Sequence, residues 1–116
     1  MNPELAKFLA GKSDDELIRF SHAHRPFMAD VMQHLPVKGA ALEIGCWKGD
    51  TTLWLLKQGF ARVTVIDTFQ GSPEHQMGFN LRAGFDAHTA ACKYDIDVME
   101  GTSACRLPEL VVRETL

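Results

Sequence analysis

One stretch of sequence decides the fold of this chain: Ala40-Ala41-Leu42-Glu43-Ile44-Gly45-Cys46-Trp47-Lys48-Gly49-Asp50-Thr51-Thr52-Leu53-Trp54-Leu55-Leu56. The run 40–44 is apolar except for Glu43 and stops at Gly45, which is typical of a buried parallel strand. Gly49 follows four residues later. The two glycines therefore predict a tight turn at the end of the strand.

A helix is predicted directly after this turn. Asp50 or Thr51 can cap its start, and Gly59 stands where a helix ends. The apolar residues of 53–56 give it a wide packing face. The start of such a helix carries unpaired N–H groups and a partial positive charge beside the strand end, so the segment predicts a site for an anionic group.

Two further segments read as strands that end in turns. The first, Phe60 to Asp67, ends on an acid 22 residues after Gly45. In Rossmann-type folds an acid at about this offset accepts hydrogen bonds from ribose hydroxyls. The second, Asp95 to Ser103, runs into a glycine turn, and Leu107–Leu110 then predicts a helix with a proline in its first turn.

These three segments, in this order, resemble the class I S-adenosylmethionine-dependent methyltransferases. The resemblance is to the branch that methylates small-molecule oxygens, which includes catechol O-methyltransferase-like enzymes. It is carried by Glu43–Thr52, by Val65–His75 and by the strand, Gly-x-Ser turn and Leu-Pro pair of 95–110, and it covers roughly Val37 to Leu110. The spacing Gly-x-x-x-Gly, rather than Gly-x-Gly-x-x-Gly, favours the methyl donor over a dinucleotide.

The resemblance implies S-adenosylmethionine as cofactor and the following cofactor-binding residues: Glu43, Gly45, Cys46, Trp47, Gly49, Thr51, Asp67, Thr68, Phe69 and Ser103. The two glycines would let the backbone pass close to the methionine part of the donor. Glu43 would hold its ammonium group through water, and Thr51 with nearby helix N–H groups would hold its carboxylate.

On the adenosine side, the resemblance assigns the ribose hydroxyls to Asp67. Thr68 and Phe69 would contact the adenosine, and Ser103 would bond the adenine edge. Trp47 would face the sulfonium, a cation that an aromatic ring favours, although simple packing in the wall of the site explains this residue equally well.

No catalytic residue is assigned. His75 has a suitable pKa for a base, but an exposed loop histidine is the more common case. The acceptor is expected to be a small molecule. In the catechol-like branch a magnesium ion is held by acids after the fourth strand, so the ligands of any divalent metal would lie beyond this chain. His22 with His24, and His88 with Cys92, lack the further ligands that a metal site needs.

The expected fold is a three-layer α/β/α Rossmann-like domain with a parallel sheet, truncated to about three strands. Residues 1–36 are expected to form a helical lead-in, and residues 37–116 a partial cofactor-binding domain that is incomplete at its C-terminus. Within the lead-in, Pro3 to Leu9 and the capping box Ser13–Glu16 predict helices, and Pro26 breaks or restarts the chain's next helix. A crossover helix is expected over 76–93, interrupted at Gly84.

Composition excludes several function classes. The chain has 12 basic and 15 acidic residues with no basic block, so nucleic-acid binding has no support. No run approaches the roughly 18 apolar residues of a membrane span. No secretory signal is evident, and three scattered cysteines indicate a reducing cytoplasm. The strand at 40–44, without a further neighbour, would expose an apolar edge and is expected to promote self-association.

Two other functions stay open at this stage. The same scaffold could support different chemistry, as in cephalosporin-hydroxylase-like relatives or a nucleotide-sugar enzyme. Alternatively, the chain could be a non-catalytic fragment that needs a partner.

Overall fold

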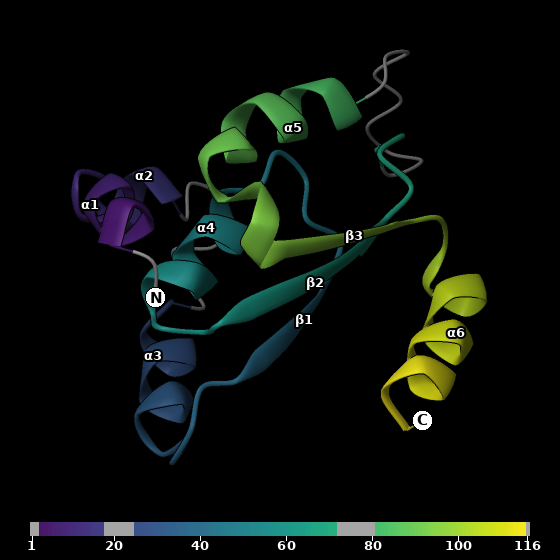
Figure 1. Ribbon diagram of the computed structural model, residues 1–116, viewed down its shortest axis with the longest axis horizontal. Helices are drawn as coiled ribbons and strands as arrows, with labels where there is room; N and C mark the ends of the chain where they lie inside the picture. Colours follow the sequence, from purple (N-terminus) through teal and green to yellow (C-terminus); the bar gives the residue numbers. More distant parts are fainter. Residues whose placement is uncertain (1–2, 18–24, 72–80, 116) are drawn as a thin grey trace.

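The computed structural model describes residues 3–17, 25–71 and 81–115 (Figure 1). Its elements, in chain order, are α1 (Pro3–Ala10), α2 (Asp14–Leu17), α3 (Arg25–Gln33), β1 (Ala40–Ile44), α4 (Asp50–Lys57), β2 (Arg62–Asp67), α5 (Arg82–Thr89), the 3₁₀ helix η2 (Ala90–Asp95), β3 (Ile96–Glu100) and α6 (Ser103–Thr115). Helices and parallel strands alternate after α3. This confirms the expected small α/β Rossmann-like fold with helices at its N-terminus.

The three strands form one parallel sheet in the order β1-β2-β3. Residues align across it in register, so that Glu43 lies beside Val65 and Val65 beside Val98. The central strand is the most buried, and Val63 and Val65 are fully enclosed. Because all strands run the same way, their carboxyl ends and the loops that follow meet at one edge of the sheet.

Helices pack on one face of the sheet, and α6 lies on the other. The main hydrophobic core joins Val63 and Val65 of β2 to Leu53 and Trp54 of α4 and to α1, α2 and α5. α6 lies apart from these helices (Figure 1). An ion pair of 2.6 Å between Arg113 and Asp97 holds α6 to the sheet. Successive residues of a strand point to alternate faces, so the Asp97 side chain lies on the face opposite to the core, into which its neighbours Ile96 and Val98 point.

The N-terminal helices follow the predicted signals. α1 begins at Pro3 and ends just before Gly11. The backbone N–H of Glu16 donates to the Ser13 hydroxyl over 3.1 Å, which is the expected cap of α2. α3 begins at Arg25, so Pro26 lies in its first turn, where its missing N–H costs no helix hydrogen bond.

Two predicted helix boundaries are wrong. α5 continues through Gly84, and the change to 3₁₀ geometry comes at Ala90 instead. A helical glycine costs only about 1 kcal/mol, and burial of the Phe85 ring beside it offsets that cost. The remaining part of the predicted helix, 76–80, lies outside the described residues.

The second error concerns α6, which begins at Ser103 rather than at Leu107, so that Pro108 falls inside the helix. Thr102 explains the earlier start. Its hydroxyl accepts a hydrogen bond from the N–H of Cys105 over 3.3 Å, and its carbonyl accepts one from Arg106 over 2.9 Å. The residue before the helix therefore acts as its cap.

Within the described ranges, none of the helices combines the length and the apolar character needed to cross a membrane.

Candidate functional site

Asp67, at the carboxyl end of β2, joins the loops that follow all three strands. Its Oδ2 accepts hydrogen bonds from the N–H groups of Cys46, at 2.8 Å, and Trp47, at 3.3 Å. Its Oδ1 accepts one from Phe69 at 2.8 Å. Its backbone carbonyl accepts one from Gly101, after β3, at 2.9 Å. The segments that the sequence singled out therefore meet at one residue.

The two glycines of the first loop have different surroundings. Both have left-handed backbones, with φ of 81° at Gly45 and 97° at Gly49. A Cβ on Gly45 would meet no described atom within 4 Å, whereas one on Gly49 would lie 2.8 Å from Cγ2 of Thr89 and 3.1 Å from the Phe85 ring. Gly49 thus allows α4 to start close against α5, and Gly45 is the glycine that borders open space.

The start of α4 lies in the same loop. Gly49 is its N-cap residue, and among the described residues no side chain caps the helix; the first N–H groups of a helix are a site that can bind an anion. Asp50 at this helix end binds His88 of α5, with 2.8 Å between Oδ1 and Nε2. Thr51, in the same turn, is half-buried.

Glu43 and Thr52 form a second polar pair beneath this loop. The fully buried Thr52 hydroxyl donates to Oε1 of Glu43. Burial raises the pKa of the Glu43 carboxyl from its ordinary 4.5 to about 7; the hydrogen bond from Thr52 opposes this rise, and the charge of Asp67 adds to it. Glu43 therefore changes its charge close to neutral pH.

Sequence reasoning missed Thr52 and the partner of His88. Thr51 and Thr52 are adjacent and chemically identical, and only the phase of α4 decides which one turns inward. Asp50 and His88 are 38 residues apart, so no local spacing connects them. The one available signal was that Thr52 falls among the apolar residues of the helix.

The Cys46 thiol is a structural group. It is buried, and its Sγ lies 3.5 Å from Oδ2 of Asp67. Burial and the charges of Asp67 and Glu43 raise its pKa far above the ordinary range. The thiol therefore stays protonated at neutral pH and has no nucleophilic character. Trp47 follows with φ of 50° and lies half-buried against the hydrophobic core.

The residues expected on the adenosine side differ in accessibility. Thr68 and Ser103 are half-buried, and Ser103 is the first residue of α6. Phe69 is 1% exposed, and its ring packs against Phe85 with 5.3 Å between centroids. The Phe69 ring thus belongs to the core, and its N–H binds Asp67. His75, like His22 and His24, lies outside the described residues.

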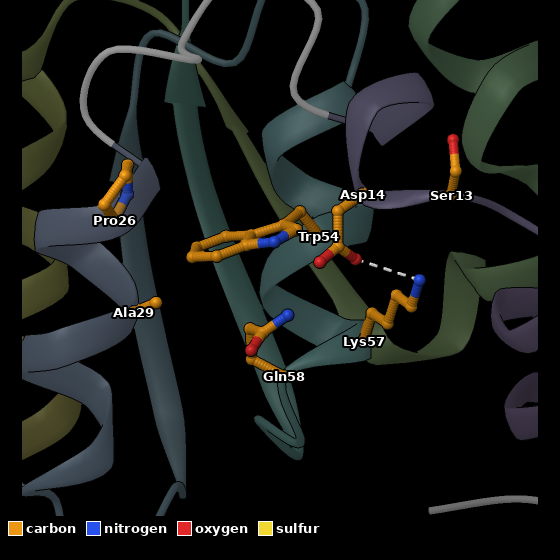
Figure 2. A pocket seen from close by; sticks show the side chains of 7 residues that line it. All are labelled: Ser13, Asp14, Pro26, Ala29, Trp54, Lys57 and Gln58. Atoms are coloured by element: carbon orange, nitrogen blue, oxygen red, sulfur yellow. Dashed lines mark ion pairs between the residues drawn. The ribbon is translucent and has the colours of Figure 1, made fainter.

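A separate cavity of about 510 Å³ lies between α2, α3 and α4 (Figure 2). The Trp54 indole extends into this region from α4 toward α3, and its buried Nε1 has no hydrogen-bond partner among the described residues. The ammonium group of Lys57, also in its wall, is paired with Asp14 at 2.9 Å. Because Lys57 ends α4, this cavity is at the far end of the helix from Gly49.

Over 3–17, 25–71 and 81–115, no group of three or more His, Cys, Asp or Glu side chains could hold a metal ion.

Comparisons with protein-family models, with curated proteins and with solved structures found no match.

Proposed function

We propose that this chain binds S-adenosylmethionine and forms the donor-binding part of a methyltransferase that acts on a small-molecule oxygen. The observation that carries the proposal is the position of Asp67. Its carboxylate lies against the Gly45 loop at the carboxyl ends of two neighbouring parallel strands, where ligands bind in open α/β sheets.

The residues around Asp67 fit the parts of this cofactor. Oδ1 of Asp67 accepts a single hydrogen bond within the part of the chain that the structure describes, and a carboxylate oxygen has room for a second donor such as a ribose hydroxyl. Ser103, the first residue of α6 after the β3 loop, would bond the adenine edge. The space beside Gly45 suits a group that must approach the backbone closely.

The other side of the loop fits the methionine part. The N–H groups at the start of α4, with Thr51, would hold its carboxylate, and Glu43 would hold its ammonium. When bound, the cofactor supplies an electrophilic methyl group, so the chain's own task is alignment. An ammonium beside Glu43 favours the ionised carboxylate, and binding near pH 6 should therefore release a proton.

Calorimetry with S-adenosylhomocysteine and, separately, with NAD tests the proposal. We expect the first ligand to bind and NAD to give no heat. Proton release would appear as a dependence of the measured heat on the ionisation enthalpy of the buffer. Binding of NAD instead of S-adenosylhomocysteine would contradict the proposal.

The Gly45→Ala variant tests whether the cofactor occupies the space beside Gly45, and Gly59→Ala is its control. Both glycines have positive φ, and an added Cβ clashes with no described atom at either: at Gly59 the nearest is Cδ of Lys38, at 3.8 Å. Both variants should lose about 1 kcal/mol of stability through backbone strain.

Only Gly45→Ala places a methyl group in the proposed cofactor space, so we expect its affinity for S-adenosylhomocysteine to fall by about tenfold or more, a cost near 1.4 kcal/mol. Gly59→Ala should bind as the native chain does. Equal losses of affinity in the two variants would show that the Gly45 loop does not contact the ligand.

A further inference from the structure

The cavity between α2, α3 and α4 lies away from the site proposed for the cofactor (Figure 2). Its volume of about 510 Å³ is within the range of small-molecule sites in proteins. Trp54, Lys57 and Gln58 line it at the C-terminal end of α4. α4 has eight residues, so the two ends of the helix are about 10 Å apart. The cavity is therefore separate from the Gly49 loop.

Trp54 brings a buried hydrogen-bond donor to this cavity. Its side chain is 1% exposed, and its Nε1 has no hydrogen-bond partner among the described residues. Figure 2 shows the indole ring extending from α4 toward α3, among the other side chains that line the cavity. An indole nitrogen can only donate, and a buried donor without an acceptor destabilises the fold. Since nearly all buried polar groups in proteins are paired, this N–H indicates an acceptor that enters from the cavity.

The charged groups in the wall of the cavity are already paired with each other. The ammonium group of Lys57 lies 2.9 Å from Oδ1 of Asp14 and also donates to the carbonyl of Lys12 at 2.6 Å. The described residues of the wall therefore contribute no net charge that would attract an ion. Pro26 and Ala29 of α3 add apolar surface across the cavity from the indole. A ligand of this cavity should accordingly be uncharged and largely apolar.

We propose that this cavity binds a small, uncharged aromatic compound whose carbonyl oxygen accepts a hydrogen bond from Nε1 of Trp54. A flat ring suits the space between the indole and the apolar wall of α3, because aromatic rings pack favourably on one another. The side-chain amide of Gln58, in the same wall, has a donor and an acceptor for the polar end of the compound. The proposal is independent of the proposed function, because the cavity and the Gly49 loop are at opposite ends of α4.

Titration of the isotope-labelled chain with benzamide, followed by NMR, tests the proposal. The chain has two tryptophans, so its spectrum contains two indole N–H signals, and the Trp47→Phe variant identifies the signal of Trp54. A new hydrogen bond to a carbonyl moves an indole proton downfield. We expect a saturable downfield shift of the Trp54 signal and no shift of the Trp47 signal. The dissociation constant should be in the millimolar range, because the probe is small.

A second probe and a pair of variants identify the groups that bind. Benzoate has the shape of benzamide but a negative charge that is costly to bury, so it should bind about tenfold more weakly or worse. Ala29→Phe fills the space beside the indole and should weaken benzamide binding by about tenfold or more. Ala87→Phe is the control, because Ala87 is an exposed residue of α5, and it should leave binding unchanged. The two probes decide the question on the native chain even if Ala29→Phe fails to fold.

Absence of a saturable shift of the Trp54 signal would overturn the proposal. Equal affinities for benzamide and benzoate, or unchanged binding by a folded Ala29→Phe variant, would overturn it as well. Magnetisation transfer between the Trp54 N–H and a bound water that persists after benzamide is added would show that the cavity holds water only, and would also contradict the proposal.

Discussion

Gly49→Ala is expected to lower the free energy of unfolding by about 3 kcal/mol, measured by urea denaturation. Two costs add. A left-handed backbone at a residue with a Cβ costs roughly 1–2 kcal/mol, and Gly49 has φ of 97°. The new Cβ would also lie 2.8 Å from Cγ2 of Thr89 and 3.1 Å from the Phe85 ring, and such overpacking costs about 1–3 kcal/mol.

Two comparisons separate these costs. Gly59→Ala has the strained backbone without the collision and should lose only the smaller amount. Thr89→Ser removes the methyl group that collides and keeps the hydroxyl that donates to the Phe85 carbonyl at 2.8 Å. Gly49→Ala combined with Thr89→Ser should therefore be less destabilised than the sum of the two single variants. Strict additivity would show that α4 and α5 do not contact each other at this point.

Glu43→Gln is expected to change how stability depends on pH. The folded pKa of Glu43, about 7, is above its ordinary 4.5. The folded state therefore binds more protons than the unfolded state between these values, and the stability due to the neutral carboxyl is present below about pH 4.5 and lost as pH rises through 7. At about 1.4 kcal/mol per pKa unit, the rise from 4.5 to about 7 corresponds to a loss on the order of 3–4 kcal/mol.

Glutamine has the same shape as glutamate and stays neutral at every pH. The Glu43→Gln variant should therefore lose this dependence of stability on pH and be more stable than the native chain at pH 8. Denaturation curves between pH 4.5 and pH 8 measure it. Glu109→Gln is the control, because Glu109 is exposed and pairs with Arg106 on the surface, a type of pair worth 1 kcal/mol or less. Parallel pH profiles for Glu43→Gln and the native chain would refute the assignment.

The sequence predicted the fold well where signals were local. The apolar run before Gly45 and the acid ending the next strand placed β1 and β2, and the Ser13 cap placed α2. Errors arose where a signal competes with packing. Gly84 breaks no helix because the Phe85 ring is buried in the core. Pro108 does not mark the start of α6 because Thr102 caps the helix earlier.

The candidate site was predictable to the same extent. The offset between Gly45 and Asp67 placed them at adjacent strand ends, and the hydrogen bonds of the first loop to Asp67 agree with that arrangement. Sequence could not reveal that Gly49 is required by α5, or that the Phe69 ring is part of the core, since both depend on contacts between distant segments. The cofactor and the reaction stay predictions.

Asp67 holds the loops after β1 and β3 in place, and this gives it a reason to persist that is independent of any ligand. A chain of this fold without any enzymatic activity would still be stabilised by these hydrogen bonds of Asp67. An aspartate at this offset from a glycine turn is therefore evidence for the fold rather than for a particular ligand. An active and an inactive chain of this fold would therefore carry the same aspartate, and the two would differ instead at residues proposed only for ligand contact, such as Ser103.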